Sequence, residues 1–320
     1  MRLRNLVLDK RYSLHSGTSI AIAFHEVRST DFSYFPGTTS SGCSFLAEVL
    51  MDACNETLAA AATSTPLLAR SLHLDGATFR ELLQQQGPSL GLWRAAEIAA
   101  LREQTYEPPI LDLGCGDGLV SSMVLPNVDI GIDPDPQPLI QAQGRGIYHQ
   151  LFALPVEQSQ LPDESISTVV SNSVLEHIPQ LDTVLEAVAR LLKPGGQLIF
   201  TAPTEAFSQW LALPIASYAT WRNHQLYHLN LWSLEQWAQH LQRVGLEIEQ
   251  VRPYLRRELV SIWDGLELLQ QIRMAKRRVF GVVWRRIPPF AIDRMAQEMS
   301  SLDLSASAPG GGRLIVARKR

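Results

Sequence analysis

The sequence predicts an α/β protein with a doubly wound, seven-stranded and mostly parallel sheet. Short apolar stretches alternate with helical segments from about residue 90 onward, which is typical of parallel strands joined by crossover helices. The stretches are apolar almost throughout, and this indicates strands that helices cover on both faces. The expected strands lie near residues 109–113, 128–132, 147–152, 167–171, 197–202, 246–252 and 312–319.

Helices are expected between these strands. Residues 66–104 have helical spacing with a break at Gly87-Pro88, and residues 182–192 and 233–244 have the same spacing. The segment Lys193–Gly196 predicts a turn that ends one helix and begins the fifth strand, because proline and glycine interrupt helices.

The sequence indicates two regions. Residues 1–88 form an N-terminal region that we expect to be mostly helical and, over its first 64 residues, loosely held in part. A strand is expected over Ser19–His25 and a helix over Phe45–Ala62. Residues 89–320 form the main domain.

The charge of the chain is unevenly distributed. Its formal net charge is −4 over 320 residues, but residues 252–320 contain 14 Lys or Arg and only 6 Asp or Glu. This tail therefore carries +8, while residues 1–251 carry −12. A basic tail on an acidic body indicates either an anionic partner or surface, or ion pairs between the tail and the body.

Cysteine and apolar content exclude several classes of protein. Cys43, Cys54 and Cys115 are too few and too scattered for a disulfide framework or a zinc site, and no metal is expected. The first ten residues lack the apolar core of a signal peptide. No apolar run reaches the roughly 18 residues of a spanning helix, so we expect a cytoplasmic protein.

The most informative segment is Ile110–Val120, in which an apolar strand leads into a glycine-rich turn. Gly114, Gly116 and Gly118 let the backbone bend sharply with no Cβ in the way, so a ligand can approach the main chain closely. The next strand ends at Asp133, 19 residues after Gly114. An acid at about that offset binds a ribose diol in nucleotide-binding βαβ units. The two segments together predict a ligand with a ribose.

The spacing and charge of the turn distinguish between nucleotide ligands. Leu119 stands where the dinucleotide fingerprint Gly-x-Gly-x-x-Gly needs its third glycine, and the Gly-Lys-Ser/Thr end of a phosphate-binding loop is absent. Asp112 and Asp117 flank the turn and would repel a pyrophosphate. They suit a ligand with positive charge and no phosphate, such as S-adenosylmethionine with its ammonium and sulfonium groups.

Two further segments carry a family resemblance. Leu161–Ile178 ends in Val-Leu-Glu-His-Ile, and Leu191–Pro203 contains Lys-Pro-Gly-Gly. In order and spacing they resemble the class I S-adenosylmethionine-dependent methyltransferases, especially the branch with small-molecule and ubiquinone- or menaquinone-pathway enzymes. The resemblance covers about residues 90–254 and 312–318. It implies a Rossmann-like sheet whose last strand lies antiparallel between the fifth and the sixth.

The resemblance implies a set of cofactor contacts. Asp112 and the glycine turn resemble the loop that holds the methionine end, and Asp133 resembles the acid that binds the ribose hydroxyls. Glu157 stands where the family usually has an Asp near the adenine, and Asn172 ends the fourth strand. The residues expected to bind the cofactor are Asp112, Gly114, Cys115, Gly116, Asp117, Gly118, Asp133, Pro134, Glu157 and Asn172.

Two insertions interrupt the main domain, at residues 204–232 after the fifth strand and residues 255–311 after the sixth. Within the second, Arg257–Arg286 predicts one long, broadly apolar helix closed by Pro288-Pro289. Both insertions leave the sheet at the carboxyl ends of its strands, where ligands of such sheets bind. We therefore expect them to form the acceptor pocket and its lid.

The helix over residues 90–101 precedes the first strand. Its Trp93, Arg94 and Glu97 either face the cofactor site or belong to the surface that packs on the sheet. Packing is the plainer interpretation, because an apolar helix at this place covers the sheet.

Candidate acceptor residues follow the fourth strand and lie in the first insertion. Methyl transfer to oxygen usually needs a base, and His is suited to this role near neutral pH. His177 and His228 are the two candidates, although His177 is often structural in the family. Arg222, His224 and Tyr227 are expected to contact the acceptor, since this mixture of polar and aromatic groups suits a sugar or aryl ring.

We therefore expect a methyltransferase that acts on a small molecule, at an oxygen of a glycan, glycolipid or secondary metabolite. Three alternatives stay open: a prenylated or lipid acceptor at a membrane surface contacted through residues 257–286, a non-catalytic binding module, and a nicotinamide-dependent oxidoreductase, which the glycine spacing disfavours. No nucleic-acid partner is expected, because Ser171–Val174 replaces the Asn/Asp-Pro-Pro-Tyr/Phe segment of nucleic-acid methyltransferases and the body is acidic. The sequence leaves the oligomeric state open.

Overall fold

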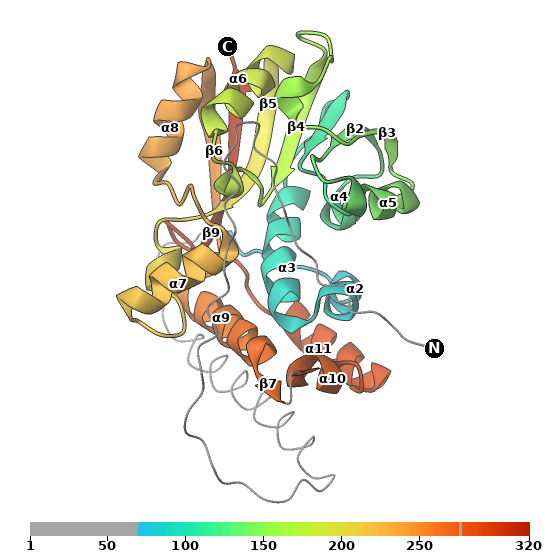
Figure 1. Ribbon diagram of the computed structural model, residues 1–320, viewed down its shortest axis with the longest axis vertical. Coiled ribbons are helices and arrows are strands. Elements are labelled where there is room, and N and C mark those ends of the chain that lie inside the picture. Colours follow the sequence, from blue (N-terminus) through green and yellow to red (C-terminus); the bar gives the residue numbers. More distant parts are fainter. Residues whose placement is uncertain (1–69, 275–276) are drawn as a thin grey trace, which may run out of the picture. The chain divides into compact units, whose positions relative to one another are not determined.

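The structure, a computed structural model, describes residues 70–274 and 277–320. The chain divides into two compact units, Met1–Asp52 and Ala53–Arg320, and every described residue belongs to the second. Figure 1 shows the described residues as a sheet with helices on its faces and a group of helices beyond one end of its strands. The elements expected before residue 64 lie outside the described residues.

Seven strands form one sheet in the order β3-β2-β1-β4-β5-β9-β6. All pairs are parallel except those of β9, which lies antiparallel between β5 and β6. This arrangement confirms the predicted fold class, including the place of the last strand. The strands span Ile110–Leu113 (β1), Val128–Ile132 (β2), Tyr148–Phe152 (β3), Ile166–Asn172 (β4), Leu192–Pro203 (β5), Leu246–Tyr254 (β6) and Gly312–Lys319 (β9).

Helices pack on both faces of the sheet because successive strand residues alternate between the faces. Val169 and Leu198 belong to the buried cluster of α6 and α8, while Val170 and Ile199 belong to that of α3. The helices span Gly76–Gln86 (α2), Pro88–Arg102 (α3), Leu119–Val124 (α4), Pro136–Arg145 (α5), Leu181–Leu191 (α6), Ala216–Leu226 (α7), Leu234–Arg243 (α8), Arg257–Gln271 (α9), Val279–Trp284 (α10) and Pro289–Ser300 (α11).

Local sequence sets where several helices begin and end. The Asp75 side chain accepts a backbone N–H from the first turn of α2, and Ser233 and Gln236 form a reciprocal capping box on α8. Gly87 ends α2 with a φ of 79°. Pro88 then begins α3 at a position where a helix needs no amide hydrogen. The predicted break between these two helices is thereby confirmed.

The sequence predicts a turn over Lys193–Gly196, before the fifth strand. In the structure this segment lies inside the strand. β5 already begins at Leu192, and its register against β4 shifts between the pairs Ile166–Leu192 and Thr168–Gln197. Extra residues in one strand of a pair form a bulge, and Gly195 takes the φ of 74° that the bulge requires.

The prediction of one long helix over residues 257–286 is wrong. The chain forms α9, then a short hairpin of β7 (Arg273–Met274) and β8 (Arg277–Arg278), and then α10. A further helix, α11, begins at Pro289, where the sequence predicts an end. The hairpin returns the chain toward α2, where the Trp284 indole donates a hydrogen bond to the Leu83 carbonyl at 3.2 Å. Tertiary packing here overrides helical periodicity.

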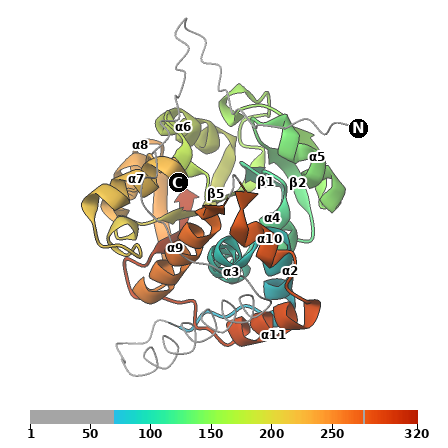
Figure 2. The same cartoon turned by 60° about the horizontal axis from the view of Figure 1, so that its bottom comes forward.

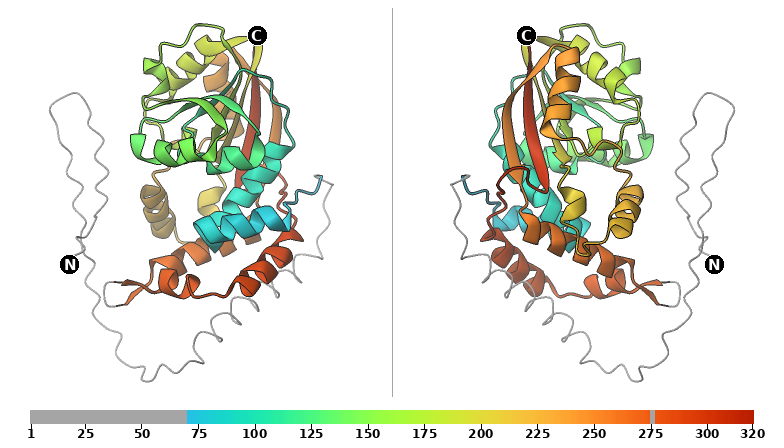
Figure 3. Two further views of the ribbon diagram at one scale, coloured as in Figure 1. Left: turned by 90° about the vertical axis from the view of Figure 1, so that its right-hand side faces the viewer. Right: turned by 90° about the vertical axis from the view of Figure 1, so that its left-hand side faces the viewer.

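The helices of the second insertion gather at the carboxyl ends of the parallel strands. Figures 2 and 3 show α9, α10 and α11 together with α2 and α3 at that end of the sheet. α9 packs against α3, and α11 packs against α2. Leu259, Val260 and Trp263 on α9 are buried in this contact layer. The apolar face of α9 is therefore used inside the protein.

The basic tail pairs with the acidic body, as one of the two interpretations of the charge asymmetry predicts. Five of its cations form ion pairs with carboxylates that precede residue 252, and four of the five lie on the last strand or directly after it. The pairs are Arg252–Glu103, Arg313–Glu205, Arg318–Glu249, Lys319–Glu164 and Arg320–Glu247. An anionic partner is thus not needed to explain these five charges.

A buried ion pair joins the two insertions. Arg222 on α7 donates from Nε to Asp264 Oδ1 on α9 at 2.7 Å, and the side chains are 1% and 0% exposed. Asp264 also accepts hydrogen bonds from the Tyr218 hydroxyl at 2.5 Å and the Ala212 N–H at 3.0 Å. The Arg222 guanidinium lies 5.5 Å from the centre of the Trp263 ring. These contacts fix α7 against α9.

The described helices differ from a membrane span in length or apolarity. None of them combines the length and the apolarity that a span across a bilayer requires. Contact of the 257–286 segment with a membrane surface stays a prediction.

Asp264→Ala is expected to destabilise the protein by about 3–5 kcal/mol, because it removes the carboxylate that is hydrogen-bonded to the buried Arg222 cation and leaves only Glu267, at 4.0 Å. Glu249→Ala is the matched control, since it removes an ion pair with Arg318 whose side chains are 46% and 44% exposed and is expected to cost less than about 1 kcal/mol. Urea unfolding followed by circular dichroism measures both. Equal losses would contradict a locking role for Asp264.

Candidate active site

The glycine turn is built by backbone hydrogen bonds that tie it to the end of β2. The N–H groups of Gly114 and Cys115 donate to the Ile132 carbonyl at 2.7 and 3.1 Å, and the Gly116 N–H donates to Asp133 Oδ2 at 3.0 Å. The two segments that the sequence predicts to share a ligand are therefore adjacent. They meet at the carboxyl ends of β1 and β2.

The three glycines differ in what their missing side chains leave room for. All have positive φ, of 71°, 53° and 70° at Gly114, Gly116 and Gly118. A Cβ at Gly114 would lie 2.5 Å from the Val174 side chain, and one at Gly118 would lie 2.7 Å from the Tyr148 ring. A Cβ at Gly116 would meet nothing within 4 Å. Gly114 and Gly118 are thus required by packing, while Gly116 faces open space.

Asp112 is turned into the protein beneath the turn. It is 2% exposed, and its Oδ2 accepts hydrogen bonds from the Ser121 and Tyr148 hydroxyls, both at 2.6 Å. Burial raises the pKa of Asp112 to about 6, although the two hydroxyls oppose the shift and the Asp133 charge adds to it. Asp112 therefore connects the turn to α4 and β3.

The other predicted cofactor residues surround the turn. The Asp117 side chain accepts the Leu119 N–H at 3.0 Å and lies 3.8 Å from Arg145, so it supports the turn where α4 begins. Cys115 is buried against the α5 side chains of Leu139 and Ala142, and burial raises the pKa of its thiol. These contacts favour a space-filling side chain at Cys115.

Asp133 and its neighbour stand at the edge of the turn. Besides the Gly116 contact, Asp133 Oδ1 accepts the Asp135 N–H at 2.9 Å. Pro134 is exposed beside it. Glu157 is exposed on the short 3₁₀ helix η1, Val156–Gln158, which follows β3. Pro134 follows β2, which neighbours β1, and Glu157 follows β3, the next strand outward.

A buried carboxylate connects α3 to the end of β4. Glu97 is 0% exposed and accepts hydrogen bonds from the Trp93 indole at 2.8 Å, the Arg94 guanidinium at 2.6 Å and the Asn172 amide at 3.0 Å. The Ser173 hydroxyl also donates to it. Glu97 thus contacts the predicted site residue Asn172 directly, and Trp93 and Arg94 are connected to it through Glu97.

The backbone at the end of β4 is strained. Ser173 has a φ of 50°, which is uncommon for a residue with a side chain. Its N–H donates to the Thr201 hydroxyl at 3.0 Å, and that hydroxyl donates to Asn172 Oδ1 at 2.8 Å. Strain of this kind persists where the surroundings hold the residue, and it concentrates at functional sites.

Glu176 is a buried acid that the sequence analysis did not nominate. It lies on the 3₁₀ helix η2, Leu175–His177, and is 1% exposed. Burial raises the pKa of Glu176 to about 8; Glu97 adds to the shift and Arg94 opposes it. The sequence signal was present, since Glu176 immediately precedes His177, but nothing in the sequence shows that its carboxylate is buried.

The two candidate histidines lie together although 51 positions separate them. The ring centres of His177 and His228 are 5.6 Å apart, and His177 Nε2 lies 3.7 Å from Glu176 Oε1. Burial lowers the pKa of His228 to about 3, assisted by the nearby His177 and Arg222, so its imidazole is neutral at pH 7. The structure therefore brings these two predicted residues to one place.

The three residues predicted to contact the acceptor have different surroundings. Arg222 is buried in the ion pair with Asp264. His224 and Tyr227 are exposed, with ring centres 6.3 Å apart. Tyr227 ends α7 with a φ of 55° and accepts a hydrogen bond from His177 through its carbonyl. A direct acceptor role for the three side chains stays a prediction.

Aromatic rings from three segments form a cluster that contacts His228. Phe207, on the 3₁₀ helix η3 (Phe207–Gln209), lies with its ring centre 5.1 Å from His228, 5.6 Å from Trp93 and 5.5 Å from Trp263. Trp93 and Trp263 are 5.0 Å apart. The sequence gives no signal for this cluster, because its members come from both insertions and from α3.

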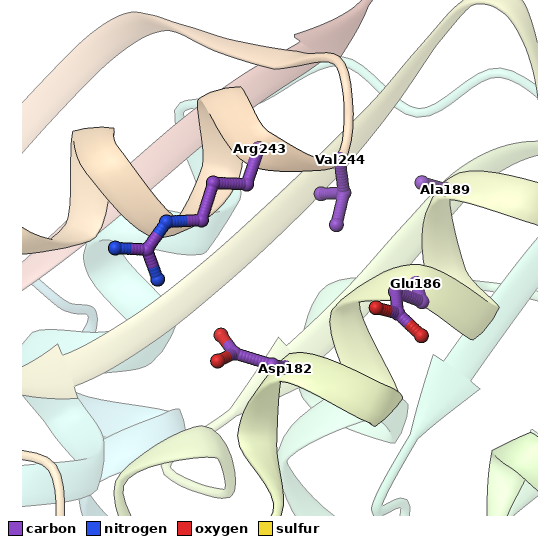
Figure 4. Close-up of a pocket in the computed structure, with 5 residues that line it drawn as sticks. All are labelled: Asp182, Glu186, Ala189, Arg243 and Val244. Carbon is purple, nitrogen blue, oxygen red and sulfur yellow. The ribbon is translucent and has the colours of Figure 1, made fainter.

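A separate groove lies on the α6 and α8 side of the sheet. It has a volume of about 320 Å³ and is lined by Asp182, Glu186, Ala189, Arg243 and Val244. Figure 4 shows these side chains on the facing surfaces of the two helices. None of the predicted site residues lines it, so it is distinct from the candidate site.

The fold and the glycine turn together define a class I methyltransferase architecture. A family model described as a methyltransferase domain matches residues 80–251. The chain belongs to this methyltransferase family, and the resemblance predicted from the sequence motifs is confirmed. S-adenosylmethionine is the methyl donor of this class.

Curated relatives match a shorter segment. A ubiquinone biosynthesis O-methyltransferase of Idiomarina loihiensis is 34% identical over 110 residues, which are 32% of this chain and 45% of that protein. The enzyme of the same name from Pseudomonas putida strain F1 is 36% identical over 103 residues, 29% of this chain and 43% of that protein. The chain thus spans about half the length of the curated relatives it matches.

Solved structures of methyltransferases are also similar. One is an S-adenosylmethionine-dependent methyltransferase of Thermotoga maritima, a possible histamine N-methyltransferase, with 14% identity, a TM-score of 0.48 and coverage of 76% of this chain and 100% of that chain. Another is phosphoethanolamine N-methyltransferase 2 of Haemonchus contortus with S-adenosyl-L-methionine, with 17% identity, a TM-score of 0.46 and coverage of 75% and 60%.

Gly118→Ala is expected to destabilise the protein by about 2–4 kcal/mol, because strain at positive φ adds to an overlap with the Tyr148 ring. Gly116→Ala introduces the same methyl group at positive φ with free space around it, and is expected to cost about 1 kcal/mol. Thermal and urea unfolding without ligand compare the two variants. Equal destabilisation would show that the turn is not packed as described.

Proposed function

We propose that the protein transfers a methyl group from S-adenosylmethionine to a hydroxyl oxygen of a small molecule that carries an aromatic ring. The observation that carries this proposal is the glycine turn held against Asp133 at the carboxyl ends of β1 and β2, in a chain of the methyltransferase family. The curated relatives, which are named O-methyltransferases, support oxygen as the accepting atom.

The residues present fit this cofactor. Asp133 lies where a carboxylate would bind the ribose diol, and Gly116 supplies open backbone beside it. The Asp112 carboxylate beneath the turn suits the positive charge of the methionine end. We further propose that the cofactor pocket is lined by Gly114–Gly118, Pro134, Glu157 and Asn172. Within this set, Cys115 and Asp117 contact the cofactor through their backbone atoms.

The chemistry requires little from the protein besides alignment. The cofactor, when bound, supplies an activated methyl group on a sulfonium. The chain must hold the acceptor oxygen in line with that group, and such alignment contributes roughly 7–11 kcal/mol. The acceptor hydroxyl must also lose its proton, which a positioned base assists by about 10²–10⁴-fold.

The acceptor is proposed to lie beside the paired histidines. Neutral His228 can accept a hydrogen bond, and the adjacent His177 can accept a hydrogen bond or a proton. The Phe207 ring contacts His228 and packs against Trp93 and Trp263, so the surroundings of the histidines are apolar and aromatic. Aromatic surfaces favour offset or edge contacts with another ring. An aryl acceptor therefore suits this place better than a sugar does.

Asp133→Ala is expected to weaken S-adenosylmethionine binding at least tenfold, because hydrogen bonds to a charged group contribute about 1.5–3 kcal/mol each. Isothermal titration calorimetry with S-adenosylmethionine and S-adenosylhomocysteine measures this. Asp163→Ala removes a 70% exposed carboxylate elsewhere and is expected to leave affinity unchanged. Failure of the unaltered protein to bind either ligand below about millimolar would overturn the proposed function.

His228→Ala is expected to lower turnover of a dihydroxybenzoate by about 10²-fold or more, with cofactor affinity unchanged, because the substitution acts on the acceptor side. Transfer of labelled methyl from S-adenosylmethionine is the measurement. His149→Ala is the control, since His149 is 65% exposed beside Asp129. Full activity of His228→Ala would remove His228 from the proposed site.

A further inference from the structure

The turn after β4 and the segment after α7 are joined by a set of hydrogen bonds. The N–H groups of Leu229 and Asn230 both donate to the Glu176 carbonyl, at 2.8 and 3.1 Å. The Asn230 side-chain amide donates to the carbonyls of Leu175 and Ile178, each at 2.8 Å. This backbone connection sets His228 opposite Glu176 and His177.

Three metal-ligating side chains converge at this junction. One ligand atom from each of Glu176, His177 and His228 lies within 4.8 Å of the others. Ligands of one ion, with bonds of about 2.0–2.2 Å, are separated by roughly 3–4 Å, so modest side-chain adjustment brings the three to bonding distance. Two of the three side chains come from η2 and the third from the first insertion.

Two atoms of the cluster lack partners among the residues that the structure describes. Glu176 Oε2 is buried and accepts no hydrogen bond there, and the same holds for His228 Nδ1. Glu176 is 1% exposed. A buried polar atom without a partner costs about 1–3 kcal/mol, so the fold retains two unfavourable atoms within this cluster. A bound cation would satisfy both.

His177 is oriented as metal-bound histidines usually are. Its Nδ1 lies 2.9 Å from the Tyr227 carbonyl, which can only accept, so Nδ1 carries the proton and donates. In the neutral ring, Nε2 then presents its lone pair on the Glu176 side. A hydrogen bond from the second ring nitrogen to a backbone carbonyl fixes the tautomer and ring orientation of metal ligands.

We propose that Glu176, His177 and His228 bind one divalent transition-metal ion on the acceptor side of the site. Two imidazole nitrogens and one carboxylate favour Zn²⁺, Mn²⁺ or Fe²⁺ over Mg²⁺ and Ca²⁺, which prefer oxygen ligands. Three protein ligands leave positions open for acceptor oxygens. This inference rests on the proposed function, and it makes His228 a ligand rather than the base.

The proposed metal site explains how an acceptor hydroxyl could lose its proton and bind as an anion, although two buried carboxyl groups lie nearby. Glu97 is paired with Arg94, and Glu176 is buried beside it, so these surroundings offer an anionic acceptor oxygen little compensation for its lost solvation. A divalent cation reverses the local charge and lowers the pKa of an oxygen bound to it. The chain's own contribution is to fix three ligands on a rigid, hydrogen-bonded junction.

The test uses the full-length protein after treatment with EDTA and buffer exchange. Titration calorimetry with ZnCl₂ and with MnCl₂ alone is expected to show one site per chain. Glu176→Gln and His228→Ala are each expected to weaken that binding at least about tenfold. His240→Ala, which alters a histidine paired with Asp182 outside the site, is expected to leave it unchanged.

Circular dichroism of each variant shows that the fold is retained. Where Glu176→Gln does not fold, His228→Asn tests the same site. No stoichiometric binding, or binding that is unchanged in the variants, overturns the metal site. S-adenosylmethionine is also titrated into the same EDTA-treated protein. If the protein binds the cofactor but no metal, only the metal site is overturned. If the unaltered protein binds no cofactor, with or without added metal, the proposed function is overturned.

Discussion

The Glu97 carboxylate is the interaction on which the arrangement of the site depends. It is fully buried, and four donors from α3 and from the end of β4 converge on it. An ionised carboxylate inside a protein is tolerated only when it is paired and hydrogen-bonded. Arg94 supplies the charge, and Trp93, Asn172 and Ser173 supply the remaining bonds. Helix α3 is thereby held across the strand ends, beside both the proposed cofactor and the proposed acceptor.

A consequence of this arrangement is that acidic groups accumulate on the ligand side. Asp112, Glu97 and Glu176 are all buried there, and burial raises the pKa values of Asp112 and Glu176. Water is largely excluded, so charges interact more strongly than in solution. The proposed cationic cofactor would favour the ionised form of Asp112, and the proposed metal ion would favour the ionised form of Glu176. An anionic ligand without a counter-ion would be disfavoured.

The sequence predicts the sheet well because the information for it is local. Most of the strands contain a short apolar run next to a glycine or an acid. The glycine turn and Asp133 indicate which edge of the sheet binds the ligand, and both are visible in the sequence without knowledge of packing. The helix predicted over residues 257–286 shows where local information ends. Its apolar spacing is real, but the chain turns at residues 273–278, since packing of α10 and α11 near α2 stabilises the molecule more than further helix does.

The sequence predicts only part of the proposed acceptor site, because that site also depends on contacts between distant segments. His177 and His228 are visible as residues suited to proton transfer, yet their proximity depends on Asn230 reaching the carbonyls around Glu176. Burial of Glu176 and the contact of Phe207, Trp93 and Trp263 likewise depend on contacts between segments far apart in the chain. The helical and strand periodicity of the sequence does not predict contacts between distant segments.

The expectation that the two insertions act as a pocket and a lid changes once their contacts are considered. Arg222 and Asp264 form a fully buried pair between α7 and α9, and Trp263 packs on the guanidinium. Parting the two helices would leave buried charges unpaired unless water replaced every contact at once. We therefore expect the two insertions to act together as one wall beside the strand ends. Because methyl transfer gains most from alignment, a wall of fixed position is better suited to this chemistry than two independent covers.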